Sequence, residues 1–107
     1  MHRFEYHAGR LHCEARPIAE LATRFGTPLY VYSADTLRTH FDRLRAAFAE
    51  LSPLICYSIK CCSNVHILRR LAGWGSGFDV VSGGELYRAL AAGADPRTIT
   101  FAGVGKT

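Results

Sequence analysis

Lys60 is the residue whose type and position most clearly suggest chemistry. It follows the largely apolar stretch 54–59 (LICYSI). A lysine at the end of such a stretch either extends its ammonium group into solvent or performs a function. In a desolvated pocket the uncharged amine is favoured, and a neutral amine can form a Schiff base with a carbonyl group. Position alone leaves both interpretations open.

The segments around Lys60 alternate between two patterns. Ranges 54–60, 77–82 and 98–102 are apolar runs of strand length, whereas 64–72 and 83–92 have helical patterns. Alternation of strands and helices is typical of βαβ units with a parallel sheet, and apolar runs fit strands buried on both faces. The sequence therefore predicts an α/β fold.

The carboxyl ends of these strands place three residues at one edge of the predicted sheet, namely Lys60, Ser82 and Gly103. Chemistry gathers at that edge in both barrels and open α/β sheets. A closed eight-stranded barrel needs about 250 residues, whereas the chain has 107. We therefore expect a truncated barrel.

The N-terminal third has weaker signals. Residues 1–16 predict a short strand or an irregular lead-in, and 17–25 predict a short helix that ends before Gly26. The β-branched and aromatic run 27–32 predicts a strand. Ser33 is a candidate helix N-cap, and the spacing of apolar residues predicts an amphipathic helix over 34–51.

Composition argues against several classes of protein. Hydrophobic residues make up 49% and charged residues 21% of the chain, which is globular composition. The net charge is +4, but the basic residues are scattered, so we do not expect nucleic-acid binding. No stretch has the roughly 20 apolar residues of a membrane helix. With four cysteines and no signal-peptide pattern, a cytoplasmic protein with free thiols is expected.

Two further site types are not expected. Gly105-Lys106-Thr107 resembles the end of a phosphate-binding P-loop, but that motif needs glycine where Thr100 stands. Adjacent cysteines on a strand point to opposite faces, and the chain lacks a CxxC pair, so no metal site is predicted.

Several separated motifs occur in order, and together they are more specific than any one of them. They are FGTPLYVY (25–32), YSIK (57–60), Ser63-Asn64, GFDVVSGGEL (77–86) and GVGKT (103–107). The combination resembles the fold-type III, or alanine-racemase-like, pyridoxal-phosphate-dependent decarboxylases. Within them it is most similar to the diaminopimelate decarboxylases.

The resemblance implies roles for two residues. Lys60 matches the catalytic lysine that binds pyridoxal 5′-phosphate covalently and later moves protons at the substrate carbon. Asp79 matches a carboxylate that lies close to this lysine and contributes to cofactor binding. The alternative for Asp79 is a polar residue without a role in catalysis, near the end of its strand.

Two local features distinguish this chain within the resemblance. The turn Ser82–Glu85 (SGGE) differs from that of ornithine-type enzymes and favours diaminopimelate as substrate. Cys61-Cys62 replaces the small or polar pair, often Ala-Asn, that commonly follows the lysine. These thiols either pack in the core or are placed to trap the cofactor aldehyde.

The expected fold is a partial TIM-type (β/α) barrel with parallel strands. Residues 1–32 would form a lead-in, and 33–107 the first βα units of the cofactor-binding barrel. The implied reaction converts meso-diaminopimelate to lysine and carbon dioxide. The alternatives are an ornithine- or arginine-type decarboxylase and an inactive fragment or non-catalytic binding module. The resemblance further implies a small-molecule amino-acid substrate and a homodimer, and the isolated chain is expected to be inactive and poorly soluble.

Overall fold

The computed structural model describes residues 2–104, so the predicted motif Gly105-Lys106-Thr107 lies outside the described residues. The chain divides into two compact units, Met1–Leu44 and Arg45–Thr107. The sequence predicts a boundary at 32/33 between a lead-in and the first βα units of a barrel, and this boundary stays a prediction.

The first unit begins with a three-stranded antiparallel sheet in the order β1-β2-β3. Its strands are β1 (Phe4–His7), β2 (Arg10–Cys13) and β3 (Arg16–Pro17). Ala8 and Gly9 both have positive φ, 48° and 75°, which matches the right-handed twist of a tight hairpin. The sequence predicts at most one strand here, because position 8 is alanine and not the asparagine or aspartate that usually marks such a turn.

The predicted short helix is confirmed as α1 (Ile18–Phe25), which ends at Gly26 with a φ of 81°. The predicted strand over 27–32 is wrong, because this segment is irregular. Its β-branched and aromatic residues favour a strand only when a neighbouring strand supplies pairing. In the described part of the chain no strand pairs with it, and Tyr30 is 85% exposed.

Helix α2 (Ala34–Ala47) begins after Ser33. The predicted N-cap is confirmed, because the Thr36 backbone N–H donates to Ser33 Oγ at 3.0 Å. The helix ends earlier than the predicted 51. A 3₁₀ turn over Ala49–Leu51 follows it, and Ser52 then takes a left-handed conformation with a φ of 46°.

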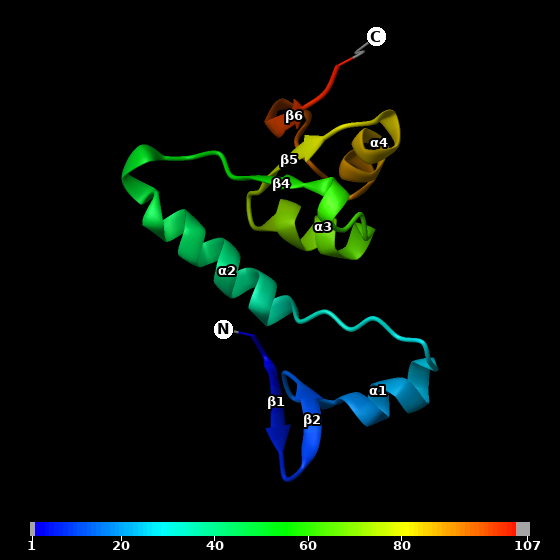
Figure 1. Ribbon diagram of the computed structural model, residues 1–107. Helices are drawn as coiled ribbons and strands as arrows, with labels where there is room; N and C mark the ends of the chain where they lie inside the picture. The colour runs from blue at the N-terminus through cyan, green and yellow to red at the C-terminus, as the bar shows by residue number, and fades with distance from the viewer. Residues whose placement is uncertain (1, 105–107) are drawn as a thin grey trace. The chain divides into compact units, whose positions relative to one another are not determined.

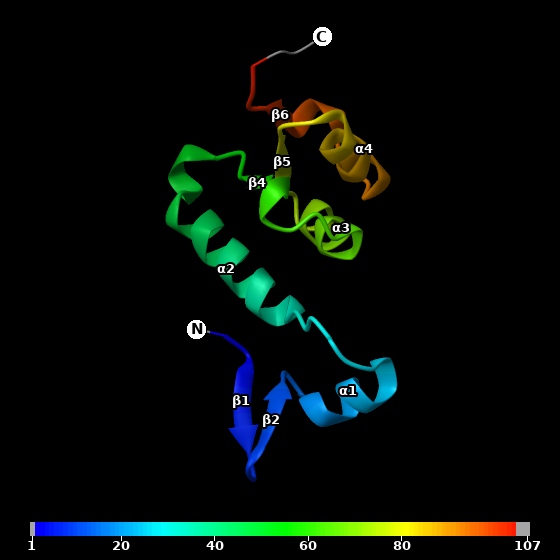
Figure 2. The same cartoon turned by 45° about the vertical axis from the view of Figure 1, so that its right-hand side comes forward.

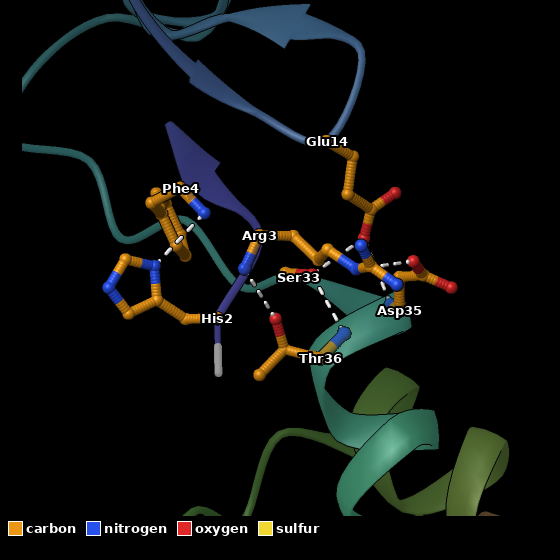
Figure 3. A network of polar contacts seen from close by, with 7 residues as sticks. All are labelled: His2, Arg3, Phe4, Glu14, Ser33, Asp35 and Thr36. Atoms are coloured by element: carbon orange, nitrogen blue, oxygen red, sulfur yellow. Dashed lines mark hydrogen bonds and ion pairs between the residues drawn. The ribbon is translucent and has the colours of Figure 1, made fainter. Parts of the chain in front are cut away.

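A polar network ties the hairpin region to the start of α2. Glu14 accepts hydrogen bonds from Ser33 Oγ at 2.8 Å and from the Asp35 backbone N–H at 2.9 Å. Arg3 pairs with Asp35 at 2.9 Å, and its backbone N–H donates to Thr36 Oγ1 at 3.0 Å. Figure 3 shows these side chains converging on the first turn of the helix. The Glu14 carboxylate thus satisfies an N–H that the helix itself leaves unpaired.

The second unit confirms the predicted strand–helix alternation (Figure 1). Its elements are β4 (Cys56–Ser58), α3 (Val65–Gly73), β5 (Gly77–Val80), α4 (Gly83–Ala91) and β6 (Ile99–Phe101). The three strands form a parallel sheet in the order β4-β5-β6. Figure 2 shows α3 and α4 on one side of this sheet, as right-handed crossovers between adjacent parallel strands require.

The core of this unit lies between the sheet and its two helices. Phe78 and Val80 of β5 are 0% and 1% exposed, and Leu68 of α3 and Ala89 of α4 are both 0% exposed. Full burial of a side chain such as Phe78 contributes about 1.5–3 kcal/mol. This packing fixes β5, and with it the alternate residues of β5 on the opposite face.

Both helices begin at side-chain caps. Asn64 Oδ1 accepts from the His66 backbone N–H at 2.9 Å at the start of α3. At the start of α4, the Glu85 backbone N–H donates to Ser82 Oγ at 3.2 Å, and Glu85 Oε2 accepts from the Val81 backbone N–H at 2.8 Å. This reciprocal pattern is close to a capping box. Among the described residues, none of the helices is long and apolar enough to cross a lipid bilayer.

Candidate active site

Asp79 occupies the central strand β5, between two hydroxyl-bearing residues. In the parallel register Ser58 of β4 and Thr100 of β6 both stand opposite Asp79. Ser58 Oγ donates to Asp79 Oδ2 at 3.3 Å, and Thr100 Oγ1 donates to Asp79 Oδ1 at 3.2 Å. Each carboxylate oxygen is therefore bound from a different neighbouring strand. We refer to Ser58, Asp79 and Thr100 as the polar row.

The polar row lies on the face of the sheet that the helices do not cover. Side chains alternate between faces along a strand. Phe78 and Val80, on either side of Asp79, are buried, and they share the helix-packed face of the sheet. Asp79 and Ser58 are half-buried, and Thr100 is exposed. The row is therefore accessible to a molecule that approaches this face.

Lys60 lies just beyond the carboxyl end of β4. The strand ends at Ser58, and Lys60 is in a 3₁₀ turn over Ile59–Cys61. The predicted edge of the sheet is thus correct, although the strand is shorter than 54–60. Ile59 is fully buried and anchors this turn, while Lys60 itself is exposed.

The expected desolvation of Lys60 is not seen in this chain. Its side chain is exposed, because three strands provide only one wall of a barrel interior. Among the described residues no ion pair joins Lys60 to Asp79, whose hydrogen-bond partners are Ser58 and Thr100. The structure places both predicted residues at the same end of the sheet without a direct contact between them.

The turn after β5 presents two glycines at the same edge. Gly83 and Gly84 are exposed and begin α4. A Cβ atom at Gly83 would meet nothing within 4 Å, and one at Gly84 would meet only Ser82 Oγ, at 3.9 Å. Space is therefore open above this turn. The Ser82 hydroxyl serves as the helix cap, accepting from the Glu85 N–H.

The two cysteines after Lys60 differ in environment. Cys61 is exposed and Cys62 is half-buried. Core packing is therefore wrong for Cys61. The Tyr57 hydroxyl donates to the Cys62 carbonyl oxygen at 3.4 Å, so the backbone of this segment is held from β4. Trapping of the cofactor aldehyde by these thiols stays a prediction.

The sequence motifs do not single out Ser58 or Thr100 as site residues. A signal for them is nevertheless present, because each is separated from Asp79 by 21 residues. Equal spacing across successive βαβ units places residues at one level of a parallel sheet when the strands are paired without a shift. The spacing alone does not show which residues stand opposite one another, because the strand register has to be known first.

The residues present fit an aldehyde cofactor. Lys60 supplies an exposed primary amine at the carboxyl end of the sheet, where ligands bind in α/β folds. The polar row supplies an oriented carboxylate on an open face nearby in the fold. A cofactor bound there would have Lys60 for its aldehyde and Asp79 as a polar partner.

Comparison with known proteins supports this interpretation. Residues 34–107 match the family model described as the pyridoxal-binding domain of pyridoxal-dependent decarboxylases. The chain is 55% identical over 97 residues to diaminopimelate decarboxylase of Neisseria meningitidis, covering 91% of the chain and 24% of that protein. It is 48% identical over 107 residues to the Haemophilus influenzae enzyme, covering 100% of the chain and 26% of that protein.

A solved structure agrees with the sequence relatives. Diaminopimelate decarboxylase of M. jannaschii, in complex with L-lysine, has a TM-score of 0.91 and 37% identity, covering 97% of this chain and 25% of that one. The chain thus spans about a quarter of the length of the relatives it matches. Its parallel sheet and helices form part of a TIM-type barrel, and pyridoxal is confirmed as the cofactor type. The chain belongs to the pyridoxal-dependent decarboxylase family.

Proposed function

We propose that this chain forms the lysine-bearing part of a diaminopimelate decarboxylase, which converts meso-diaminopimelate to lysine and carbon dioxide. The observation that carries the proposal is the position of Lys60, at the carboxyl end of β4 and near the open face that holds Asp79. The names of the similar proteins favour diaminopimelate over ornithine or arginine. The relative solved with L-lysine binds the product of this reaction.

Lys60 and Asp79 would have distinct roles. The amine of Lys60 would hold the cofactor aldehyde and would move a proton at the substrate carbon. Asp79 contributes a fixed negative charge to the same site. Pyridoxal phosphate, when bound, supplies the electron sink that stabilises the carbanion, while the protein supplies orientation and electrostatics.

The remaining features of the proposal follow from the family. We expect the complete enzyme to act on a small amino acid as a homodimer in the cytoplasm. The four free cysteines are compatible with a reducing compartment.

Covalent trapping tests the role of Lys60. The monomeric fraction of the chain is incubated with pyridoxal 5′-phosphate, reduced with borohydride and digested, and the labelled peptide is identified by mass spectrometry. Label is expected at Lys60, and Lys60→Arg should abolish it. Lys106, the second lysine of the chain, provides the matched control, because Lys106→Arg should leave the label at Lys60 unchanged. Equal labelling of both lysines would favour a non-catalytic module.

A chimera tests the activity itself. The corresponding segment of the Haemophilus influenzae enzyme, which aligns with all 107 residues, is replaced by this chain. Release of carbon dioxide from meso-diaminopimelate is expected, and Lys60→Arg should reduce it below detection. If the chimera bound pyridoxal 5′-phosphate but released no carbon dioxide, the assignment of this chain would be wrong.

A further inference from the structure

We infer that Ser58 and Thr100 are positioning residues, which hold the plane of the Asp79 carboxylate for the cofactor that Lys60 binds. This inference rests on the proposed function and adds two residues to the site. Neither hydroxyl need touch the cofactor or the substrate, because both would act through Asp79.

The geometry gives each carboxylate oxygen its own donor. Ser58 Oγ is 3.3 Å from Oδ2 and Thr100 Oγ1 is 3.2 Å from Oδ1. The terminal torsion of an aspartate is broad and nearly two-fold, so one donor leaves the carboxylate free to turn. Two donors on opposite sides of the group restrict that rotation. Because they come from β4 and β6, the carboxylate is fixed relative to the whole sheet.

The two hydroxyls differ in the strength of their contribution. Thr100 Oγ1 also lies 3.4 Å from the Phe78 carbonyl oxygen, and a hydroxyl has only one proton to donate. Thr100 therefore divides its donation between two acceptors, whereas the Ser58 hydroxyl donates to Asp79. Removal of the Ser58 hydroxyl should have the larger effect.

The residue types at this level of the sheet argue for a role beyond folding. Strands of a parallel sheet are ordinarily apolar on both faces. Valine has nearly the same shape as threonine, so folding alone does not require a hydroxyl at position 100. The polar row nevertheless carries a hydroxyl on either side of one carboxylate. Its side chains lie on the face away from α3 and α4, where Thr100 is exposed and so adds little to the core. Orientation of Asp79 accounts for both hydroxyls at once.

A double-mutant cycle separates positioning from a general structural effect. Ser58→Ala and Thr100→Val are made alone and together with Asp79→Asn. The rate of borohydride-trappable adduct formation between Lys60 and pyridoxal 5′-phosphate is measured on the monomeric fraction of each variant. Each hydroxyl substitution should slow adduct formation by about three- to tenfold in the parent and have no further effect beside Asp79→Asn. Thr100→Ser, which keeps the hydroxyl, should restore the parent rate.

The control is a substitution in β6 that leaves the polar row intact. Ile99→Val alters β6 on the other face, opposite Phe78, and should leave the rate unchanged. Equal losses from the hydroxyl substitutions with and without Asp79 would overturn the inference, as would an unchanged rate in both single variants or in Asp79→Asn. Absence of any label at Lys60 in the parent chain would instead contradict the proposed function.

Discussion

Close packing around Gly77 affects how the strands align next to the polar row. Gly77 of β5 stands opposite Cys56 of β4. A Cβ atom at Gly77 would lie 2.4 Å from the Thr98 carbonyl oxygen and 2.8 Å from Cys56 Sγ. The first of these contacts is with backbone, which cannot rotate away. Glycine at this position lets the three strands approach closely enough to align Ser58, Asp79 and Thr100.

We expect Gly77→Ala to destabilise the second unit by about 1–3 kcal/mol, because overpacking forces the backbone to shift. Urea denaturation followed by circular dichroism measures the change. Gly73→Ala is the matched control, since a Cβ atom there would meet nothing within 4 Å. A stability of Gly77→Ala equal to that of the control would show that the sheet can widen without cost.

The elements of the second unit could be predicted from the sequence, whereas several in the first could not. The alternation over 54–102 reflects strands whose apolar side chains pack against α3 and α4, which leaves a clear apolar signal in each strand. The hairpin at Ala8-Gly9 depends on a tight turn without its usual residues, and the run 27–32 lacks a pairing strand. Local composition does not reveal whether a partner strand exists.

The site could be predicted in part for a similar reason. Lys60 stands out because a charge ends an apolar run. Asp79 is identified only through resemblance to a family, and Ser58 and Thr100 depend on strand register, which the sequence does not state. The exposure of Lys60 is a tertiary property, since burial depends on how many walls surround the amine.

The start of α2 should make the first unit sensitive to acid. The pKa of Glu14 is lowered, first by the hydrogen bond from the Asp35 backbone N–H and then by that from Ser33. A group whose native pKa is depressed stabilises the fold above its unfolded value and loses that effect as pH falls through the native value. The stabilisation by Glu14 should therefore fade below its reference value of 4.5.

Glu14→Gln provides the test of this pH dependence. Near pH 6 the substitution should lower stability, because a neutral amide accepts more weakly than a carboxylate. The difference from the parent should shrink toward pH 3, as measured by thermal unfolding at a series of pH values. Glu20→Gln is the control, since Glu20 is an acidic residue of α1 outside this network. A difference that stayed constant with pH would contradict the role given to the carboxylate.

At the scale of the whole molecule, the sheet β4-β5-β6 has two outer strands. In the described chain β4 and β6 each pair only with β5, so one edge of each has unpaired backbone groups. Such edges pair readily with other chains. The open face with the polar row would also lack the opposite wall of a barrel.

We therefore expect the 107-residue chain alone to aggregate and to release no carbon dioxide from meso-diaminopimelate. Light scattering and a carbon dioxide assay on the purified chain provide the measurement, with the chimera described above as the active control. A decarboxylation rate above background from the monomeric chain would show that the remaining walls are dispensable.

The network at Glu14 has a consequence for synthesis in the cell. Its hydrogen bonds join residues between Arg3 and Thr36, and all of these leave the ribosome before Cys56, the first residue of β4. The hairpin can thus close on the first turn of α2 while the βα repeats are still being translated. The nascent chain would then carry a helix whose Asp35 and Thr36 N–H groups are already paired before the second unit is complete.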